Sequence, residues 1–141
     1  MKIVVDSNII FSALISGKEI YLDIFKMNDI YTPDIVFHEL NKYESHLIKK
    51  TKLKQAEFRM FVQMLFEKIA VIPKFAVSIE NWQDAYKICK KIDEKDTPFI
   101  ALSLELGIPL WTNDKALCGG AKKMGFDNFV ATEKLLQGIN N

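Results

Sequence analysis

This chain of 141 residues has little of what several protein classes require. Only Cys89 and Cys118 are cysteines, and they make neither a disulfide framework nor a CxxC pair. A disulfide-rich secreted scaffold is therefore excluded. We expect both thiols to be structural residues that behave as small hydrophobes, in the reducing environment of the cytoplasm.

A strong charge of one sign and long hydrophobic runs are also missing. The 19 Lys and Arg residues against 18 Asp and Glu residues leave a formal net charge of +1, so any contact with nucleic acid must come from a local patch. The apolar runs are much shorter than the ~18 residues of a membrane span, and Asp6 interrupts what would be the core of a signal peptide. We expect a protein that is not exported and does not contact a membrane.

The composition that remains suits one folded domain. Hydrophobic residues make up 49% of the sequence, a fraction that excludes disorder. A chain of this length can bury most of its apolar surface, so we predict a single domain over residues 1–141.

The apolar pattern alternates between short strands and amphipathic helices. It predicts strands at residues 1–6, 30–31, 69–72, 109–111 and 128–130. It predicts helices at residues 7–14, 19–27, 34–50, 54–67, 78–91, 97–106, 115–124 and 133–137. Asp34 is the expected N-cap of its helix, and Pro98 lies in a first turn, where a missing N–H is tolerated.

Strands that alternate with helices in this way indicate a parallel sheet with helices on both faces. We predict an α/β fold, a three-layer α/β/α sandwich around a central parallel sheet of about five short strands. In such sheets, ligands bind at the carboxyl ends of the strands near a topological switch point. The fold class therefore indicates where to search for a site.

Acidic residues occur at these positions. Asp6 ends the first strand, and Asp114 follows the strand at 109–111. Asp96 begins the helix that leads into that strand, and Glu39 lies one turn into its own helix. If the strands are neighbours, the four side chains converge, although two carboxylates about 5 Å apart repel by roughly 3 kcal/mol at an effective dielectric near 20.

A divalent cation would compensate for this repulsion. Mg²⁺ takes oxygen ligands, is usually held by one or two carboxylates and bridges to phosphate. It can lower the pKa of a bound water and orient an in-line attack on phosphorus.

Each acid also has a purely structural interpretation. Asp6 and Asp114 could be helix N-caps, Asp96 could interact with a helix dipole, and Glu39 could be a solvated helix residue. Asp93 is a possible extra acid, or a loop or capping residue.

Other catalytic motifs are incomplete. Gly17-Lys18 lacks the leading glycine and the following Ser or Thr of a phosphate loop. His38-Glu39 lacks the second histidine of a zinc protease, because Lys42 stands four residues after His38. Nucleotide-binding and zinc-protease functions therefore have no support in the sequence.

Three segments resemble a known family: IVVDSN at 3–8, VFHEL at 36–40 and DTPFIALSLELGIPLWTND at 96–114. Nearly the whole chain is similar to a PIN domain, the metal-dependent nuclease fold that includes the VapC-like toxins of toxin–antitoxin systems. Pro98-Phe99 follows Asp96 where many toxin members have small or aliphatic residues, which leaves the subfamily open.

The resemblance implies a role for particular residues and partners. It implies Mg²⁺ or Mn²⁺ as cofactor, RNA as substrate, a homodimer, and a small antitoxin protein as a further partner. The acidic catalytic and metal-site residues would be Asp6, Glu39, Asp96 and Asp114. Asn8 and Thr112 match positions that support the acids by hydrogen bonding, which fixes carboxylate orientation.

A basic segment follows Glu39. Against Glu44 and Glu57 it has six cations, a local excess of +4, located at Lys42, Lys49, Lys50, Lys52, Lys54 and Arg59. They are possible RNA-binding residues, because phosphate neutralisation supplies most non-specific affinity, or else a solvated helix face.

We predict a metal-dependent endoribonuclease that hydrolyses RNA phosphodiester bonds with metal-activated water, as the toxin of a toxin–antitoxin pair. The alternative is a non-catalytic PIN-like module that binds RNA or protein.

Overall fold

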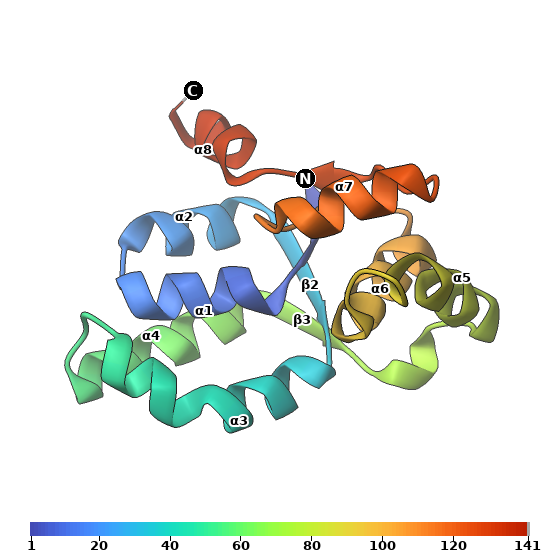
Figure 1. Ribbon diagram of the computed structural model, residues 1–141. Helices are drawn as coiled ribbons and strands as arrows, with labels where there is room; N and C mark the ends of the chain where they lie inside the picture. Colours follow the sequence, from blue (N-terminus) through green and yellow to red (C-terminus); the bar gives the residue numbers. More distant parts are fainter. Residues whose placement is uncertain (141) are drawn as a thin grey trace.

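Five short parallel strands form the centre of the computed structural model, as the sequence predicts (Figure 1). The structure describes residues 1–140. Their order across the sheet is β3-β2-β1-β4-β5, and each neighbouring pair is parallel. The strands are β1 (Lys2–Val5), β2 (Asp29–Pro33), β3 (Ile69–Ile72), β4 (Leu110–Trp111) and β5 (Phe129–Val130).

Helices connect the strands, close to the predicted boundaries. The α-helices are α1 (Ser7–Ser16), α2 (Glu19–Met27), α3 (Ile35–Lys50), α4 (Gln55–Glu67), α5 (Ile79–Cys89), α6 (Thr97–Leu106), α7 (Lys115–Lys123) and α8 (Thr132–Asn140). Two short 3₁₀ helices, η1 (Lys74–Ala76) and η2 (Glu94–Asp96), were not predicted, because three residues are too few for a hydrophobic period. None of the helices in residues 1–140 has the length and hydrophobicity to cross a membrane.

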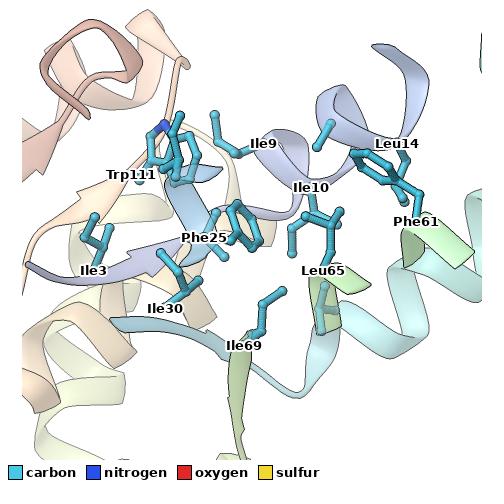
Figure 2. Packing of buried hydrophobic residues seen from close by; sticks show 14 of the residues in the cluster. Ile3, Ile9, Ile10, Leu14, Phe25, Ile30, Phe61, Leu65, Ile69 and Trp111 are labelled. Atoms are coloured by element: carbon cyan, nitrogen blue, oxygen red, sulfur yellow. The ribbon is translucent and has the colours of Figure 1, made fainter. Parts of the chain in front are cut away.

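Side chains of the strands alternate between two hydrophobic cores. On β1, Ile3 and Val5 belong to one core and Val4 to the other. On β4, Trp111 and Leu110 divide in the same way. The first core packs under α1, α2, α3, α4 and α8 (Figure 2), and the second under α5, α6 and α7. The fold is therefore the predicted three-layer α/β/α sandwich, with α1 to α4 and α5 and α6 on opposite sides of the strands (Figure 1).

The topological switch point lies between β1 and β4. From β1 the chain adds β2 and β3 on one side, and then returns to place β4 and β5 on the other side. Val5 pairs with Trp111 at the carboxyl ends of these strands, and the Asp6 N–H donates to the Trp111 carbonyl at 3.1 Å. The residues that follow β1 and β4 therefore flank the crevice where parallel sheets bind ligands.

The residue predicted as the N-cap of α3 stands at that position, but its side chain binds elsewhere. Asp34 stands at the N-cap position of α3, but its side chain makes no capping hydrogen bond. Its backbone is already helical, and its Oδ2 accepts from the backbone N–H of Lys74 at 3.2 Å instead. Asp34 therefore fixes the segment after β3 rather than the start of α3.

Candidate active site

Asp6 is held at the switch point by β1, which it follows, and by β4 and the residue after it. It follows β1, is 3% exposed, and is the N-cap of α1. Its Oδ1 accepts from the Asn8 backbone N–H at 3.4 Å, and its Oδ2 accepts from Thr112 Oγ1 at 2.8 Å. The predicted hydrogen bond from Thr112 is thus present. The bond from residue 8 comes from its backbone, while the Asn8 side chain is exposed and lines a groove.

Glu39 is fixed by a residue that the sequence did not single out. The Ser7 hydroxyl donates to Glu39 Oε2 at 2.7 Å and joins α1 to α3. Ser7 is buried and Glu39 is half-buried, so Glu39 is not a fully solvated helix residue. No local signal predicts this pair, because the two residues lie 32 positions apart in the chain.

Asp96 has an anionic oxygen without a partner. It ends η2 at the N-cap position of α6, but its side chain makes no capping hydrogen bond. Its Oδ2 is buried and has no hydrogen-bond donor. Nearby Asp93 is exposed, and its Oδ1 accepts from the Lys95 backbone N–H at 3.0 Å. Asp93 thus caps η2, whereas Asp96 Oδ2 has no hydrogen-bond partner.

Asp114 caps α7 after β4. Its Oδ1 accepts from the Leu117 backbone N–H at 3.0 Å, and its own N–H donates to Thr112 Oγ1 at 3.1 Å. Thr112 therefore connects Asp114 to Asp6. For Asp6 and Asp114 the capping interpretation is correct, and it coexists with a position at the switch point.

Burial and mutual repulsion raise the pKa values of two acids. Burial is the largest cause for Asp6, whose pKa rises from 3.8 although the hydrogen bonds from Thr112 and Asn8 oppose the rise. Burial, and then the charges of Asp6, Asp93, Asp114 and Glu39, raise the pKa of Asp96 to about 7. All four predicted acids therefore belong to one electrostatic cluster.

The thiol of Cys89 lies close to Asp96 and Asp93 but is buried. Cys89 is fully buried. Burial is the main cause that raises its pKa to about 11, and Asp96 and Asp93 add to the effect. Cys89 therefore stays protonated at neutral pH, as expected of a structural cysteine.

A groove of about 510 Å³ opens over three of the four acids. Its walls include Asp6, Glu39 and Asp96, together with the possible extra acid Asp93. Asp114 does not line it. In residues 1–140, no group of three or more His, Cys, Asp or Glu side chains is arranged to hold a metal ion. The structure thus gathers acidic oxygens at one groove without enclosing a cation in a preformed cage.

Helix N-termini surround these carboxylates. Asp6, Asp96 and Asp114 stand directly before α1, α6 and α7. The N-terminus of a helix carries a partial positive charge of about half an elementary charge, which favours a nearby anion. These termini offset part of the repulsion among the carboxylates and also attract phosphate groups.

None of the six basic residues predicted to contact RNA lines the acidic groove. All six side chains are exposed. The Lys42 ammonium lies 5.4 Å from the centre of the Tyr43 ring, which lines the acidic groove. Arg59 instead lines a separate cavity of about 270 Å³ between α3 and α4. Lys95, which the sequence did not single out, lines the acidic groove.

Comparison with protein families gives a match to the family described as PIN domain, over residues 4–136. The chain belongs to the PIN domain family. Membership gives this PIN domain a nuclease-type fold, as the resemblance implied. No curated protein matches its sequence.

A solved structure supports the architecture. This PIN domain is similar to PAE2754 from Pyrobaculum aerophilum, with a TM-score of 0.69 and 12% sequence identity, over 99% of this chain and 96% of the other. At that identity the likeness concerns the fold alone.

Proposed function

We propose that this PIN domain is a metal-dependent endoribonuclease that hydrolyses RNA phosphodiester bonds. The observation that carries the proposal is the unpaired, buried Oδ2 of Asp96, in a groove that it shares with Asp6 and Glu39. An anionic oxygen without a donor is costly unless a proton or a cation compensates it. The raised pKa of Asp96 shows that a proton is one way to neutralise this carboxylate. A bound divalent cation is the other way.

The donor set fits Mg²⁺ or Mn²⁺. Carboxylate oxygens are the ligands that these hard cations prefer, and Mg²⁺ usually keeps several waters and takes only one or two carboxylates. The lack of a closed three-residue cage is therefore compatible with this cation. Among Asp6, Glu39, Asp96 and Asp114, one or two carboxylates would bind the cation directly, and the others would contact its waters. When bound, such a cation supplies a water of lowered pKa and positive charge at the phosphate.

The protein's own groups orient the reactants. Thr112 fixes Asp6, and Ser7 fixes Glu39, so that both carboxylates face the groove. Helix N-termini and Lys95 attract the phosphodiester to this end of the groove. Hydrolysis adds water to phosphorus and releases the leaving oxygen of the ribose. A serine or cysteine nucleophile is unnecessary.

The test is cleavage of a mixed pool of structured RNAs with Mg²⁺, Mn²⁺ or EDTA. We expect cutting with either cation, none in EDTA, and none by Asp96→Asn purified identically. Equal cutting by both proteins would contradict the assignment of Asp96 or indicate a contaminating nuclease.

The resemblance to VapC-like toxins extends the proposal to a cytoplasmic toxin that forms a homodimer and binds an antitoxin. Expression of the wild-type protein should then arrest growth of a bacterial host, and expression of the Asp96→Asn variant should not.

Ser7→Ala gives a second prediction. Loss of the hydroxyl removes the one hydrogen bond described for Glu39 Oε2, so this carboxylate should sample other rotamers. We expect cleavage and metal affinity to fall about 10- to 100-fold, as for other groups that orient metal ligands. Metal-dependent cleavage rates and thermal unfolding measure the effect. Ser45→Ala, on the exposed face of α3 outside the groove, is the matched control, and an equal loss there would contradict a specific role for Ser7.

The absence of a preformed group of three metal ligands among the described residues favours one alternative, a non-catalytic module that binds RNA or protein. A metal titration separates the two. No divalent binding at millimolar concentration, with RNA affinity intact, would support the module.

A further inference from the structure

The groove continues from the carboxylates along two helices. On α1 it is lined by Asn8, Ser12 and Ile15, and on α3 by Glu39, Tyr43 and His46. The first and last residues of each set are seven positions apart, which at a rise of about 1.5 Å per residue is about 10 Å. That length is about three times the 3.4 Å that separates neighbouring nucleotides of a stacked strand. The groove is therefore long enough for nucleotides that flank a bond at the acidic end.

The far end of the groove meets the turn between α3 and α4. Thr51 Oγ1 donates to the Leu14 carbonyl at 2.7 Å, and the Lys52 N–H donates to the Ile15 carbonyl at 3.0 Å. Ile15 lines the groove, so this turn closes it. The exposed cations of the turn are Lys49, Lys50, Lys52 and Lys54. These lysines do not line the groove itself, but they belong to the turn that contacts its far end, opposite the acidic end.

An aromatic ring stands between these two ends. Tyr43 lines the groove, is half-buried, and lies one turn after Glu39 on the same helix face. Phe11 meets it edge to face, with ring centres 5.7 Å apart. Phe11 also lines the groove and packs against the first hydrophobic core, so it anchors the Tyr43 ring to that core. The Lys42 ammonium lies over the Tyr43 ring, 5.4 Å from the ring centre.

We propose that Tyr43 stacks a nucleobase of single-stranded RNA next to the bond held at the carboxylates, while the strand runs along α1 and α3 towards the lysines of the α3–α4 turn. A groove that joins cations to an aromatic platform is how proteins bind single strands. Paired bases of a duplex are stacked within the helix and offer no free face. This inference rests on the proposed ribonuclease function for the position of the bond.

Binding tests the inference separately from cleavage. In an Asp96→Asn background, fluorescence anisotropy would measure binding of a labelled single-stranded RNA of about 10 nucleotides and of the same strand annealed to its complement. We expect Tyr43→Ala to weaken single-strand binding about 5- to 150-fold, the range for loss of one base–aromatic stack. Tyr43→Phe keeps the ring and should bind like the parent. The duplex should bind more weakly and show no dependence on residue 43.

Two further variants separate stacking from folding. Tyr43→Leu keeps an apolar side chain in contact with Phe11 but has no aromatic face. It should lose single-strand binding to the same extent as Tyr43→Ala, and it replaces that variant in the test if the alanine protein does not fold. Tyr86→Ala removes an exposed tyrosine of α5, outside the groove, and should leave binding unchanged. Binding by Tyr43→Leu equal to that of the parent, or duplex binding as tight as single-strand binding, would overturn the inference.

An abasic scan locates the stacked base. Replacing nucleotides one at a time by an abasic residue should weaken binding to the Tyr43 protein at one position but leave binding to Tyr43→Leu unchanged there. If no position behaves in this way, Tyr43 does not stack a base. The failure of the proposed function looks different: the wild-type protein would then cut no RNA with any cation, while the dependence on Tyr43 in binding persisted.

Discussion

Asparagine in place of Asp6, Asp96 or Asp114 is expected to abolish RNA cleavage and to preserve the fold. Asparagine caps a helix nearly as well as aspartate, so the caps of α1 and α7 survive, whereas the anionic ligand is lost. Loss of a group that only orients a metal ligand costs about 10- to 100-fold, so loss of a ligand should cost more than about 100-fold. Metal-dependent cleavage rates measure activity, and thermal unfolding checks the fold.

Asp84→Asn is the matched control, because Asp84 is exposed on α5 and does not line the groove. It should cut RNA like the wild type. Alanine variants would be less informative at Asp6 and Asp114, since they remove the helix cap together with the charge. Retained cleavage in all three asparagine variants would show that the acidic groove is not the catalytic site.

The stability of the metal-free protein is expected to fall as the pH rises from about 4 to about 7. The pKa of Asp96 is 3.8 in the reference state and about 7 in the folded protein. Between these values the unfolded chain has lost the proton that the folded chain still binds, so each increase in pH favours unfolding. The contribution of Asp96 is complete below pH 3.8 and is lost as the pH rises through about 7. The raised pKa of Asp6 acts in the same direction.

Thermal unfolding in EDTA measures this effect, with Asp96→Asn as the comparison. A free-energy difference of about 1 kcal/mol shifts the Tm of a domain of this size by roughly 4 °C. Asp96→Asn, which is uncharged at every pH, should therefore be the more stable protein at neutral pH and lose that advantage near pH 4. A Tm difference that does not depend on pH would contradict the raised pKa.

Mg²⁺ should reverse the order at neutral pH. A cation at about 100 times its Kd stabilises the wild type by about 2.7 kcal/mol, and Asp96→Asn should gain much less. The same carboxylate that destabilises the metal-free protein would then contribute to cation binding. This opposition distinguishes a binding site from an acid that serves only as a helix cap.

Much of the fold follows from local patterns. The continuous apolar run of β1 and the helical spacing of apolar residues in α3 are each complete within a few residues, so they can be recognised without the tertiary structure. The position of Asp6 and Asp114 after strands, and the parallel sheet implied by alternating elements, indicated the edge where the acids meet. Asp34 stands at the predicted N-cap position, but local sequence could not show that its side chain binds a distant partner, the backbone N–H of Lys74.

Local patterns were sufficient to predict the strands, the helices and the family, and they named the acids as candidate site residues. Only the tertiary structure decided that Ser7 holds Glu39, that Thr112 joins Asp6 to Asp114, that Asp96 keeps an unpaired oxygen, and that Tyr43 faces the groove on a support from Phe11. The physical reason is distance along the chain. Ser7 and Glu39 lie 32 positions apart, and Asp6 and Thr112 lie 106 apart, so these contacts depend on how the helices pack on the sheet and on no local period.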